Sequence, residues 1–410
     1  MGDERNGYML SGARARRGYD WWWHSLVATS EKTGERRPFF IEYYVINPGF
    51  GDAEPVAGQL PANKKAGRKP CYAMIKAGCW GAAAKAQLHN LYPVAAFSAS
   101  RDGMDVRIGD HVATETRLKG SVSLSAADAA AHPEYMSDSG EMSWDLEAEK
   151  ILRFSVGWGT SAFFRKLDAF NMYWHVAGMR TRYKGVITFN GERFIVSPDD
   201  SFGYQDKNWG RDYTSPWVWL NCNNLRSRKT GKLLERSSLD VGGAQPVAFG
   251  ISLPRRLLIA LHYEGAFYEW NFSKFWTGSK QVFDCPVRDD RVEWNIDAWH
   301  GKAKVEIRFS CPRDTMLNVN YEKTPTARSG TTRCGTAATP PARYGCSRGA
   351  AANGSRSTSS KASWAAASTE NTTARARRLS GRRRREPRRG SRLRRRRRIA
   401  PPWSVWTASR

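Results

Sequence analysis

The sequence lacks the features of several common protein classes. Its seven cysteines are scattered, with no CxxC motif and no histidine-paired cluster, which argues against a disulfide framework and a zinc site. No stretch approaches the ~18 apolar residues that a membrane-spanning helix needs, and the N-terminal segment has no apolar signal-peptide core. The glycines of GWGTSAF (Gly157–Phe163) do not have the GxGxxG spacing of a dinucleotide loop. These absences predict a cytoplasmic protein with no metal and no cofactor.

Acidic residues are scarce in the C-terminal part of the chain. After Lys323 the sequence holds 22 of the 65 basic residues but only Glu370 and Glu386 of the 39 acidic ones, a net charge of +20. Residues 1–323 carry a net charge of only +6. Because no basic stripe interleaved with aromatic residues occurs in that larger part, we expect no specific nucleic-acid partner.

Residues 324–410 differ in composition from the rest of the chain. They are rich in Ala, Ser, Thr, Gly and Arg, cannot bury a core, and are therefore predicted to be disordered. A basic tail of this kind can bind RNA or an anionic membrane. A second hypothesis is a frameshift: runs of Arg, Ala, Thr, Gly and Pro arise when GC-rich codons are read out of frame, and a shifted frame at Arg333–Ala338 permits Leu-Trp-Asn-Gly-Gly.

Strand patterns dominate the remaining sequence. Short segments rich in β-branched and aromatic residues alternate with turn formers such as Asn190-Gly191, a typical hairpin signal. The main segments are Pro38–Ile46, Met104–Asp110, Thr116–Ser125, Tyr183–Val196, Trp217–Cys222, Arg291–Trp299 and Lys304–Cys311. Only two short helices are expected, over Ala82–His89 and Ala126–His132. The pattern predicts an all-β protein built of sandwiches or barrels.

The strand-rich blocks occur twice along the chain. One lies before residue 150 and the other runs from Tyr183 to Cys311. We therefore expect two β domains, at residues 1–160 and 161–323, followed by the tail at 324–410.

Two segments place an aspartate among aromatic side chains. RRGYDWWWHS (Arg16–Ser25) sets Asp20 beside three tryptophans, and FGYQDKNWG (Phe202–Gly210) sets Asp206 near a tyrosine and a tryptophan. Aromatic rings that exclude water from a carboxyl group favour its protonated form, and their faces stabilise a nearby cation. The pattern favours acid-driven attack on an apolar alkene. The alternative is that these aromatic strands simply fill a core.

At these motifs the chain resembles the tocopherol cyclase family, which is related to the hydroxyneurosporene synthase (carotenoid hydratase) and lipocalin-like group. The resemblance rests on RRGYDWWWHS, AFNMYWHVAGM (Ala169–Met179) and SFGYQDKNWGRDYTSPWVWLNCNNL (Ser201–Leu225), and extends from about Tyr8 to about Tyr321. It implies two lipocalin-like β-barrel or sandwich domains packed together. The family would continue with further strands after Lys323, so the second domain is expected to be incomplete.

The resemblance also implies a reaction. The enzyme would protonate the trisubstituted double bond of a prenylated quinol and close a chromanol ring, as an intramolecular lyase or isomerase that needs no cofactor. Its partner would be a hydrophobic small molecule, with peripheral membrane contact as a further expectation. Two alternatives remain open: a carotenoid hydratase-like enzyme, in which water is the nucleophile, and a noncatalytic lipid or isoprenoid carrier.

Asp206 is the first candidate for the general acid. Tyr204 and Trp209 are expected to desolvate it and raise its pKa. The alternative is an ion pair with a nearby cation such as Lys207. Asp20 is the second candidate, with turn capping as its alternative.

Two histidines lie among aromatic residues. His24 in WWWHS and His175 in MYWHV are candidates for a proton donor or for a base that orients the phenol. The alternative for each is a hydrogen-bonded core residue.

A further set of residues is expected to bind the substrate. Trp217 and Trp219 share one strand face by the period of two, and Asn221 on that face could hydrogen-bond a phenol. The complete set is Trp22, Glu42, Tyr204, Trp209, Trp217, Trp219 and Asn221. Core packing is the alternative for the aromatic residues, and a solvent-facing position is the alternative for Glu42. Asp240 is expected at the surface.

Overall fold

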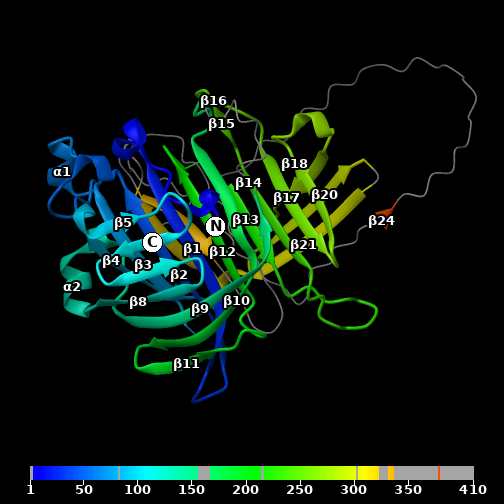
Figure 1. The fold of residues 1–410 in the computed structure, drawn as a ribbon, viewed down its shortest axis with the longest axis horizontal. Coiled ribbons are helices and arrows are strands. Elements are labelled where there is room, and N and C mark those ends of the chain that lie inside the picture. The colour runs from blue at the N-terminus through cyan, green and yellow to red at the C-terminus, as the bar shows by residue number, and fades with distance from the viewer. Residues whose placement is uncertain are drawn as a thin grey trace, which may run out of the picture.

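The structure is a computed structural model. It describes residues 3–81, 84–155, 167–213, 217–301, 303–322, 331–336 and 377–378. Strands make up almost all regular structure of these residues (Figure 1), which confirms the predicted all-β fold. The helical elements are short: α1 (Pro61–Lys65), α2 (Ala126–Ala131) and the 3-10 turns η1 (Glu4–Asn6), η2 (Gly12–Arg16), η3 (Pro48–Phe50), η4 (Val94–Ala96), η5 (Pro133–Tyr135), η6 (Phe275–Thr277) and η7 (Arg313–Thr315).

The first sheet contains twelve strands in the described part of the chain. They are β1 (Tyr19–Ser30), β2 (Arg36–Ile46), β3 (Tyr72–Cys79), β4 (Ala86–Tyr92), β5 (Phe97–Ala99), β6 (Asp105–Ile108), β7 (His111–Thr114), β8 (Arg117–Leu124), β9 (Gly140–Phe154), β10 (Met172–Phe189), β11 (Glu192–Val196) and β12 (Gly203–Gly210). The order is β4-β3-β2-β1-β11-β10-β9-β8-β7-β6-β5, and β12 pairs with both β1 and β10.

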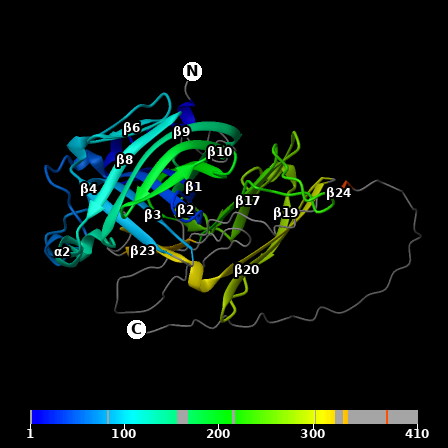
Figure 2. The same ribbon diagram turned by 90° about the horizontal axis from the view of Figure 1, so that it is seen from below.

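The first sheet curls until its two sides meet. Asn90 of β4 exchanges hydrogen bonds of 2.9 and 3.0 Å with the backbone of Ser123 in β8. The Tyr43 hydroxyl, on β2, donates to the carbonyl oxygen of Val112 in β7 at 2.9 Å. These contacts close the sheet into a barrel, which is seen from its side in Figure 2.

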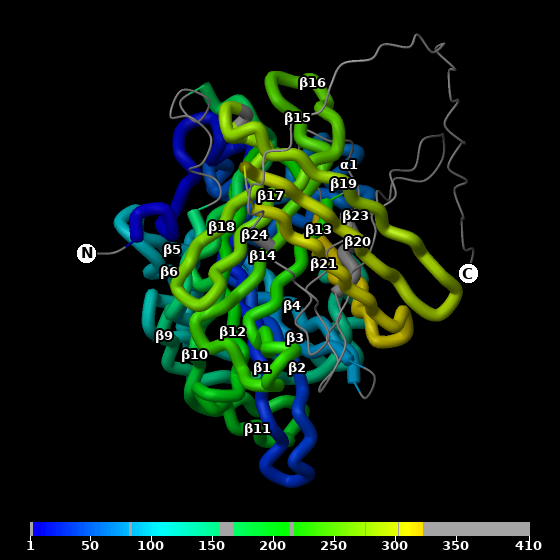
Figure 3. The backbone as a smooth tube through the Cα atoms, turned by 90° about the vertical axis from the view of Figure 1, so that its right-hand side faces the viewer, coloured from blue at the N-terminus to red at the C-terminus, as the bar shows by residue number. Residues whose placement is uncertain are grey.

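Further sheets pack beside the barrel. They consist of β13 (Trp217–Cys222), β14 (Ser238–Ala244), β17 (Arg256–Tyr263) and β18 (Ala266–Asn271); of the hairpin β15 (Val247–Ala248) and β16 (Ile251–Ser252); of β19 (Lys280–Asp284), β20 (Arg291–His300), β21 (Ala303–Pro312) and β24 (Arg377–Arg378); and of β22 (Leu317–Glu322) and β23 (Thr331–Thr336). In Figure 3 the strands β13, β14, β17 and β18 lie in front of β1, β2 and β12.

The division of the chain into domains 1–160 and 161–323 stays a prediction. The first sheet continues past residue 160, because β10 pairs with β9 on one side and with β12 on the other, to Gly210. Of the tail predicted to be disordered, the structure describes β23 and β24, and β23 pairs with β22. Residues 324–330, 337–376 and 379–410, the rest of the suggested frameshift product, lie outside the described residues.

Strand β1 shows why the run of three tryptophans suits this fold. Successive side chains of a strand point to opposite faces, so Trp22 enters the barrel core while Trp21 and Trp23 enter a second core between the barrel and the neighbouring sheets. Both faces are buried, so from Tyr19 to Leu26 the strand shows no alternation of buried and exposed side chains. Strands β2, β3 and β12 have the same two-sided burial.

Two local predictions are confirmed and one is wrong. Asn190 and Gly191 form the tight turn between β10 and β11, both with positive φ angles (49° and 78°), and Ala126–Ala131 is helix α2. The helix predicted over Ala82–His89 is instead strand β4 from Ala86 onward. Pairing with β3 overrides the helical propensity of the alanines there.

Candidate active site

Strand β12 divides its side chains between the two cores. Tyr204 belongs to the core between the barrel and the neighbouring sheets, and Asp206 and Asn208 share its face by alternation. Gln205, Lys207 and Trp209 point to the barrel side. The strand is buried along its whole length, so both faces carry polar groups away from water.

Asp206 is a fully buried carboxyl group that accepts hydrogen bonds on one of its two oxygens. Trp174 Nε1 donates to Asp206 Oδ2 at 2.7 Å, and the Tyr204 hydroxyl donates to the same oxygen at 3.3 Å. Asn208 Nδ2 lies 3.5 Å from it. The other oxygen, Oδ1, has no hydrogen-bond partner among the described residues. Because Oδ2 accepts these hydrogen bonds, the proton of the neutral acid belongs on Oδ1.

Burial determines the charge of Asp206. Loss of hydration raises the pKa of its carboxyl group to about 8, and the nearby Glu42 carboxylate adds to this, while the hydrogen bonds from Trp174 and Tyr204 oppose it. At neutral pH this carboxyl group is therefore mainly protonated. It has the form of a general acid, which delivers a proton best when its pKa lies near the working pH.

A cavity of about 130 Å³ opens beside Asp206. It is lined mainly by apolar and aromatic residues of β10, β12, β13 and β14, among them Trp174, Trp217, Trp219 and Gly242. An engineered apolar cavity of about 150 Å³ holds benzene, so this space suits one ring or a few prenyl carbons. Ala244 and Pro246, which are also in the lining, come just before the β15–β16 hairpin in the sequence.

The glycine of β14 lets the indole of Trp174 lie close to that strand. A Cβ atom at Gly242 would stand 2.0 Å from the Trp174 ring, so no other residue fits without moving the indole. Trp219, in the lining, packs against Tyr204, with ring centroids 4.7 Å apart. Such faces stabilise a cation by about 0.5–2 kcal/mol each, more when water is excluded.

The structure brings some of the predicted residues together at this cavity and separates others. Asp206, Tyr204, Trp217 and Trp219 meet there, although Tyr204 stands behind Asp206 rather than in the lining. Trp209 was expected to desolvate Asp206, but it points to the other face of β12 and stacks on Tyr173 at 5.5 Å. Side chains an odd number of positions apart point to opposite faces of a strand, and Trp209 is three positions after Asp206.

Asp20 lies on the barrel side as part of a buried ion pair. It pairs with Lys207, whose ammonium group is 3.8 Å from the ring centroid of Trp22, and it accepts a 2.8 Å hydrogen bond from the Met9 amide. Burial raises the pKa of Asp20, and the Lys207 charge opposes that rise. Asp20 and Trp22 are not in the lining of the cavity beside Asp206.

The two candidate histidines also lie on the barrel side. His24 Nδ1 is 2.8 Å from the Tyr183 hydroxyl, and His175 Nε2 is 3.1 Å from Asp3 Oδ2. Burial lowers the pKa of both imidazoles, so both are neutral at physiological pH. They do not line the cavity, and their roles in proton transfer stay predictions.

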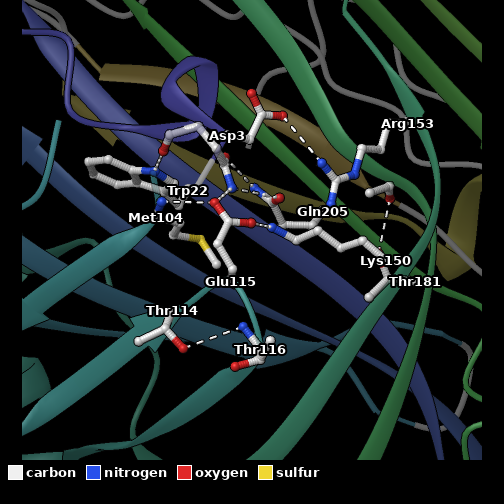
Figure 4. Close-up of polar contacts among 12 residues, drawn as sticks. Asp3, Trp22, Met104, Thr114, Glu115, Thr116, Lys150, Arg153, Thr181 and Gln205 are labelled. Atoms are coloured by element: carbon white, nitrogen blue, oxygen red, sulfur yellow. Dashed lines mark hydrogen bonds and ion pairs between the residues drawn. The ribbon is translucent and has the colours of Figure 1, made fainter. Parts of the chain in front are cut away.

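Figure 4 shows a polar network on the barrel side that includes Glu115, Lys150 and Gln205. Lys150 pairs with Glu115, and Asn6 donates to Glu115 Oε1 at 3.1 Å and to Gln205 Oε1 at 3.3 Å. The Trp22 indole donates to the Asn6 carbonyl oxygen at 2.7 Å. The network thus fastens η1 and the adjoining N-terminal residues to the barrel.

Glu42 is buried, so the alternative of a solvent-facing position is wrong. It lies 3.3 Å from Lys76 Nζ and accepts a 2.8 Å hydrogen bond from the Tyr321 hydroxyl. Burial raises the pKa of Glu42, and Lys76 opposes this rise. Glu42 is outside the cavity lining, yet its charge acts on Asp206.

Asn221 is also outside the lining, where it holds strands together. Its side-chain amide lies 3.4 Å from the carbonyl oxygens of Met179 and Leu239. Those contacts occupy the amide hydrogens that had been expected to bind a phenol.

Sequence reasoning missed two residues at this site. Trp174 is part of the AFNMYWHVAGM motif, but its contact with Asp206 depends on the pairing of β10 with β12, in which it stands opposite Asn208. Asp240 was expected at the surface and is instead fully buried in β14. Its neighbours Leu239 and Val241 are apolar, which was the available signal for a buried strand.

Two kinds of feature are absent from the described residues. No group of three or more His, Cys, Asp or Glu side chains is placed to hold a metal ion in those parts of the chain. Over the same residues, no helix has the length and apolar character required to cross a bilayer.

Two tocopherol cyclases are among the curated proteins that this chain resembles. The chain is 28% identical over 172 residues to the probable chloroplastic tocopherol cyclase of Oryza sativa subsp. japonica, covering 40% of this chain and 31% of that protein. It is 28% identical over 164 residues to the chloroplastic tocopherol cyclase of Zea mays, covering 38% and 29%. The matched region thus spans about three tenths of the length of these relatives.

Solved structures offer only distant likenesses. One is described as an AttH of Nitrosomonas europaea, with a TM-score of 0.41, 13% identity and coverage of 77% of this chain and 88% of that chain. Another is kievitone hydratase from Nectria haematococca, with a TM-score of 0.35, 11% identity and coverage of 77% and 86%. The sequence shows the family, because the family model described as tocopherol cyclase-like matches residues 70–340 of this chain. The chain belongs to the tocopherol cyclase-like family.

Proposed function

We propose that the protein is a cyclase that closes a ring on a prenylated quinol by protonating its alkene. One observation carries the proposal: Asp206, a buried acid with a pKa of about 8, borders an apolar cavity lined by Trp174, Trp217 and Trp219. An acid, an anhydrous space and aromatic faces are what the protonation of an alkene requires.

The reaction can be written with its atoms in balance. The Oδ1 proton of Asp206 adds to the less substituted alkene carbon and leaves a tertiary cation on its neighbour. The phenol oxygen of the quinol bonds to that cation and releases its proton, which returns to the Asp206 carboxylate. Substrate and product are isomers, so no electrons or water are consumed. The indole rings act on the intermediate only, since the charge exists only on the reaction path.

The test is to incubate the purified protein with prenylated quinols in D₂O and analyse the products by mass spectrometry. We expect a chromanol one mass unit heavier than the substrate, with deuterium in place of hydrogen on one carbon, because the acid proton exchanges with solvent before it is transferred to carbon. Asp206→Asn should form it roughly 10²- to 10⁴-fold more slowly. A product heavier by one water would instead establish a hydratase. Tight binding of quinol, carotenoid and polyprenyl lipids, all recovered unchanged, would establish a carrier and overturn the cyclase.

The same proposal includes delivery of the substrate from a lipid surface. Phe249 and Ile251 at the β15–β16 turn are 57% and 68% exposed, and this hairpin follows Pro246, which lines the cavity. Phe249 holds a positive φ angle of 50°, which is unusual for a bulky side chain, and this conformation presents its ring to solvent. Arg255 and Arg256, both exposed, follow the hairpin and suit anionic headgroups.

Flotation with anionic phospholipid vesicles tests this contact. We expect the double variant Phe249→Asp/Ile251→Asp to bind vesicles at least about 10-fold more weakly, because burying each of these side chains contributes roughly 1.5–3 kcal/mol. Its turnover of detergent-solubilised substrate should not change. Ile195→Asp on β11, an exposed apolar position at the opposite end of the barrel in Figure 1, is the control. Equal binding by both variants would exclude the hairpin as the contact.

A further inference from the structure

Strand β12 places a second polar side chain, Asn208, in the lining of the cavity. Asn208 is 3% exposed and lies two residues after Asp206 on the same face of the strand. In the strand register it stands opposite Trp21 of β1 and Trp174 of β10. An amide group is thus fixed about 7 Å along the strand from the proposed acid.

The amide of Asn208 has unused hydrogen-bonding capacity. Its Nδ2 atom lies 3.5 Å from Asp206 Oδ2, beyond the length of about 2.7–3.2 Å of an ordinary N–H···O hydrogen bond. Its Oδ1 atom accepts no hydrogen bond from the described residues. A buried amide without partners costs free energy, which an apolar side chain of similar volume would not. Packing alone therefore does not account for an asparagine at this position.

Other polar side chains of the lining are already engaged. The Ser273 hydroxyl donates to Asn271 Oδ1 at 2.6 Å, and the Trp219 indole donates to Asp240 Oδ1 at 3.1 Å. These donors are held by partners outside the lining. A hydroxyl group that enters the cavity beside the acid would therefore find its acceptor in Asn208 Oδ1.

Ring closure requires a correctly placed nucleophile as well as an acid. Protonation of the alkene leaves a tertiary cation with three possible fates. Attack by the phenol oxygen gives the ring, attack by water gives a tertiary alcohol, and loss of a proton gives back an alkene. The outcome depends on which group is held against the cation. A phenol hydroxyl that donates its hydrogen to an amide oxygen keeps its lone pairs free for this attack.

We propose that Asn208 Oδ1 binds the phenol hydroxyl that becomes the ring oxygen and thereby directs the cation to cyclisation. This inference rests on the proposed function of Asp206, and it gives Asn208 the role that was expected of Asn221. It defines the substrates as phenols with a free hydroxyl group ortho to the prenyl chain. As the C–O bond forms, the O–H bond breaks and its proton goes to the Asp206 carboxylate. Asn208 exchanges no atom with the substrate.

A binding experiment tests this assignment without turnover. The probe is a prenylated quinol whose reacting double bond is saturated, and it is compared with the same compound carrying hydrogen in place of the ortho hydroxyl group. Isothermal titration calorimetry measures both dissociation constants. The preference for the hydroxyl compound should fall roughly 5- to 30-fold from the wild-type protein to Asn208→Leu, because only the amide is left unpaired by the compound that lacks the hydroxyl.

Ser273→Ala is the matched control, since it removes a polar atom from the same lining. It should keep the wild-type preference, because the Ser273 hydroxyl already donates to Asn271. A preference that is lost in Ser273→Ala and kept in Asn208→Leu would overturn the proposal, as would equal preferences in all three proteins. Asn208→Ala gives the same comparison if leucine prevents folding, and thermal unfolding verifies that each variant is folded.

The fate of the cation gives a second test. In D₂O, Asn208→Leu should still protonate a reactive prenylated quinol but release more of the cation as deuterated alkene or tertiary alcohol. We expect the ratio of chromanol to these products to fall about 10-fold, whereas Asp206→Asn should slow all products together. An unchanged ratio in Asn208→Leu would refute its role in directing the nucleophile. If the wild-type protein forms neither chromanol nor labelled alkene, the cyclase fails while the binding experiment still decides the role of Asn208.

Discussion

Two buried aspartates lie on the two sides of β12, and they differ in whether they keep their charge. On the barrel side Asp20 keeps its charge, because Lys207 lies against it as a counter-ion. On the cavity side Asp206 has no cation among its hydrogen-bond partners, and its pKa rises to about 8. Burial with a counter-ion produces a fixed structural pair, and burial without one produces an acid that can give up a proton. The comparison predicts that one site governs stability and the other governs chemistry.

The largest expected effect is on turnover. Asp206→Asn keeps the shape of the side chain but removes the proton, so kcat should fall roughly 10²- to 10⁴-fold while KM changes little. Steady-state kinetics on a prenylated quinol measures both constants. Full activity in this variant would move the role of the acid to the barrel side, where parallel His24→Gln and His175→Gln variants would then locate it.

The matching change on the barrel side should affect stability instead. Asp20→Asn leaves the Lys207 charge buried without a counter-ion, which we expect to lower the free energy of unfolding by about 3–5 kcal/mol in denaturant titrations. The double variant Asp20→Leu/Lys207→Met removes both charges and should recover most of that loss. A stable Asp20→Asn protein without activity would contradict the separation of the two faces.

Two tryptophans provide a smaller and matched comparison. Trp217→Leu removes an aromatic face from the cavity but keeps apolar bulk, and should lower kcat by roughly 5- to 30-fold, equivalent to about 1–2 kcal/mol, with less change in lipid affinity. Trp209→Leu, on the other side of β12, should leave kcat nearly unchanged. Equal losses in the two variants would show that the rings act through packing alone.

The expected effect per pH unit is smallest for the pH dependence of stability. The pKa of Asp206 is higher in the folded protein than in the unfolded chain, so the folded state binds the additional proton between about pH 4 and about pH 8. This group therefore makes the free energy of unfolding fall as pH rises through that window, by at most about 1.4 kcal/mol per unit. Denaturant titrations should show a shallower fall in Asp206→Asn. An unchanged slope would mean that Asp206 ionises normally.

Several parts of the site were predictable from residues close together in the sequence. The alternation of β12 and β13 already groups Tyr204 with Asp206 and Trp217 with Trp219, because side chains two apart share a face. The assignment of Trp209 to Asp206 ignored that rule. Asp240 was missed because the sequence around it is a short strand with one charge, a pattern that also fits a solvated edge.

The sequence alone determined an all-β chain and two aspartates placed beside aromatic residues, Asp20 in Arg16–Ser25 and Asp206 in Phe202–Gly210. Those features follow from composition and from the period of two, which are properties of single strands. Only the tertiary structure decided that Lys207 neutralises Asp20 rather than Asp206, and that Trp174, Trp219 and Asp240 gather around the latter. These contacts join β1, β10, β12, β13 and β14, whose register and packing are set by long-range pairing. The charge of a buried carboxyl group depends on such neighbours, and therefore the chemistry was decided by the fold.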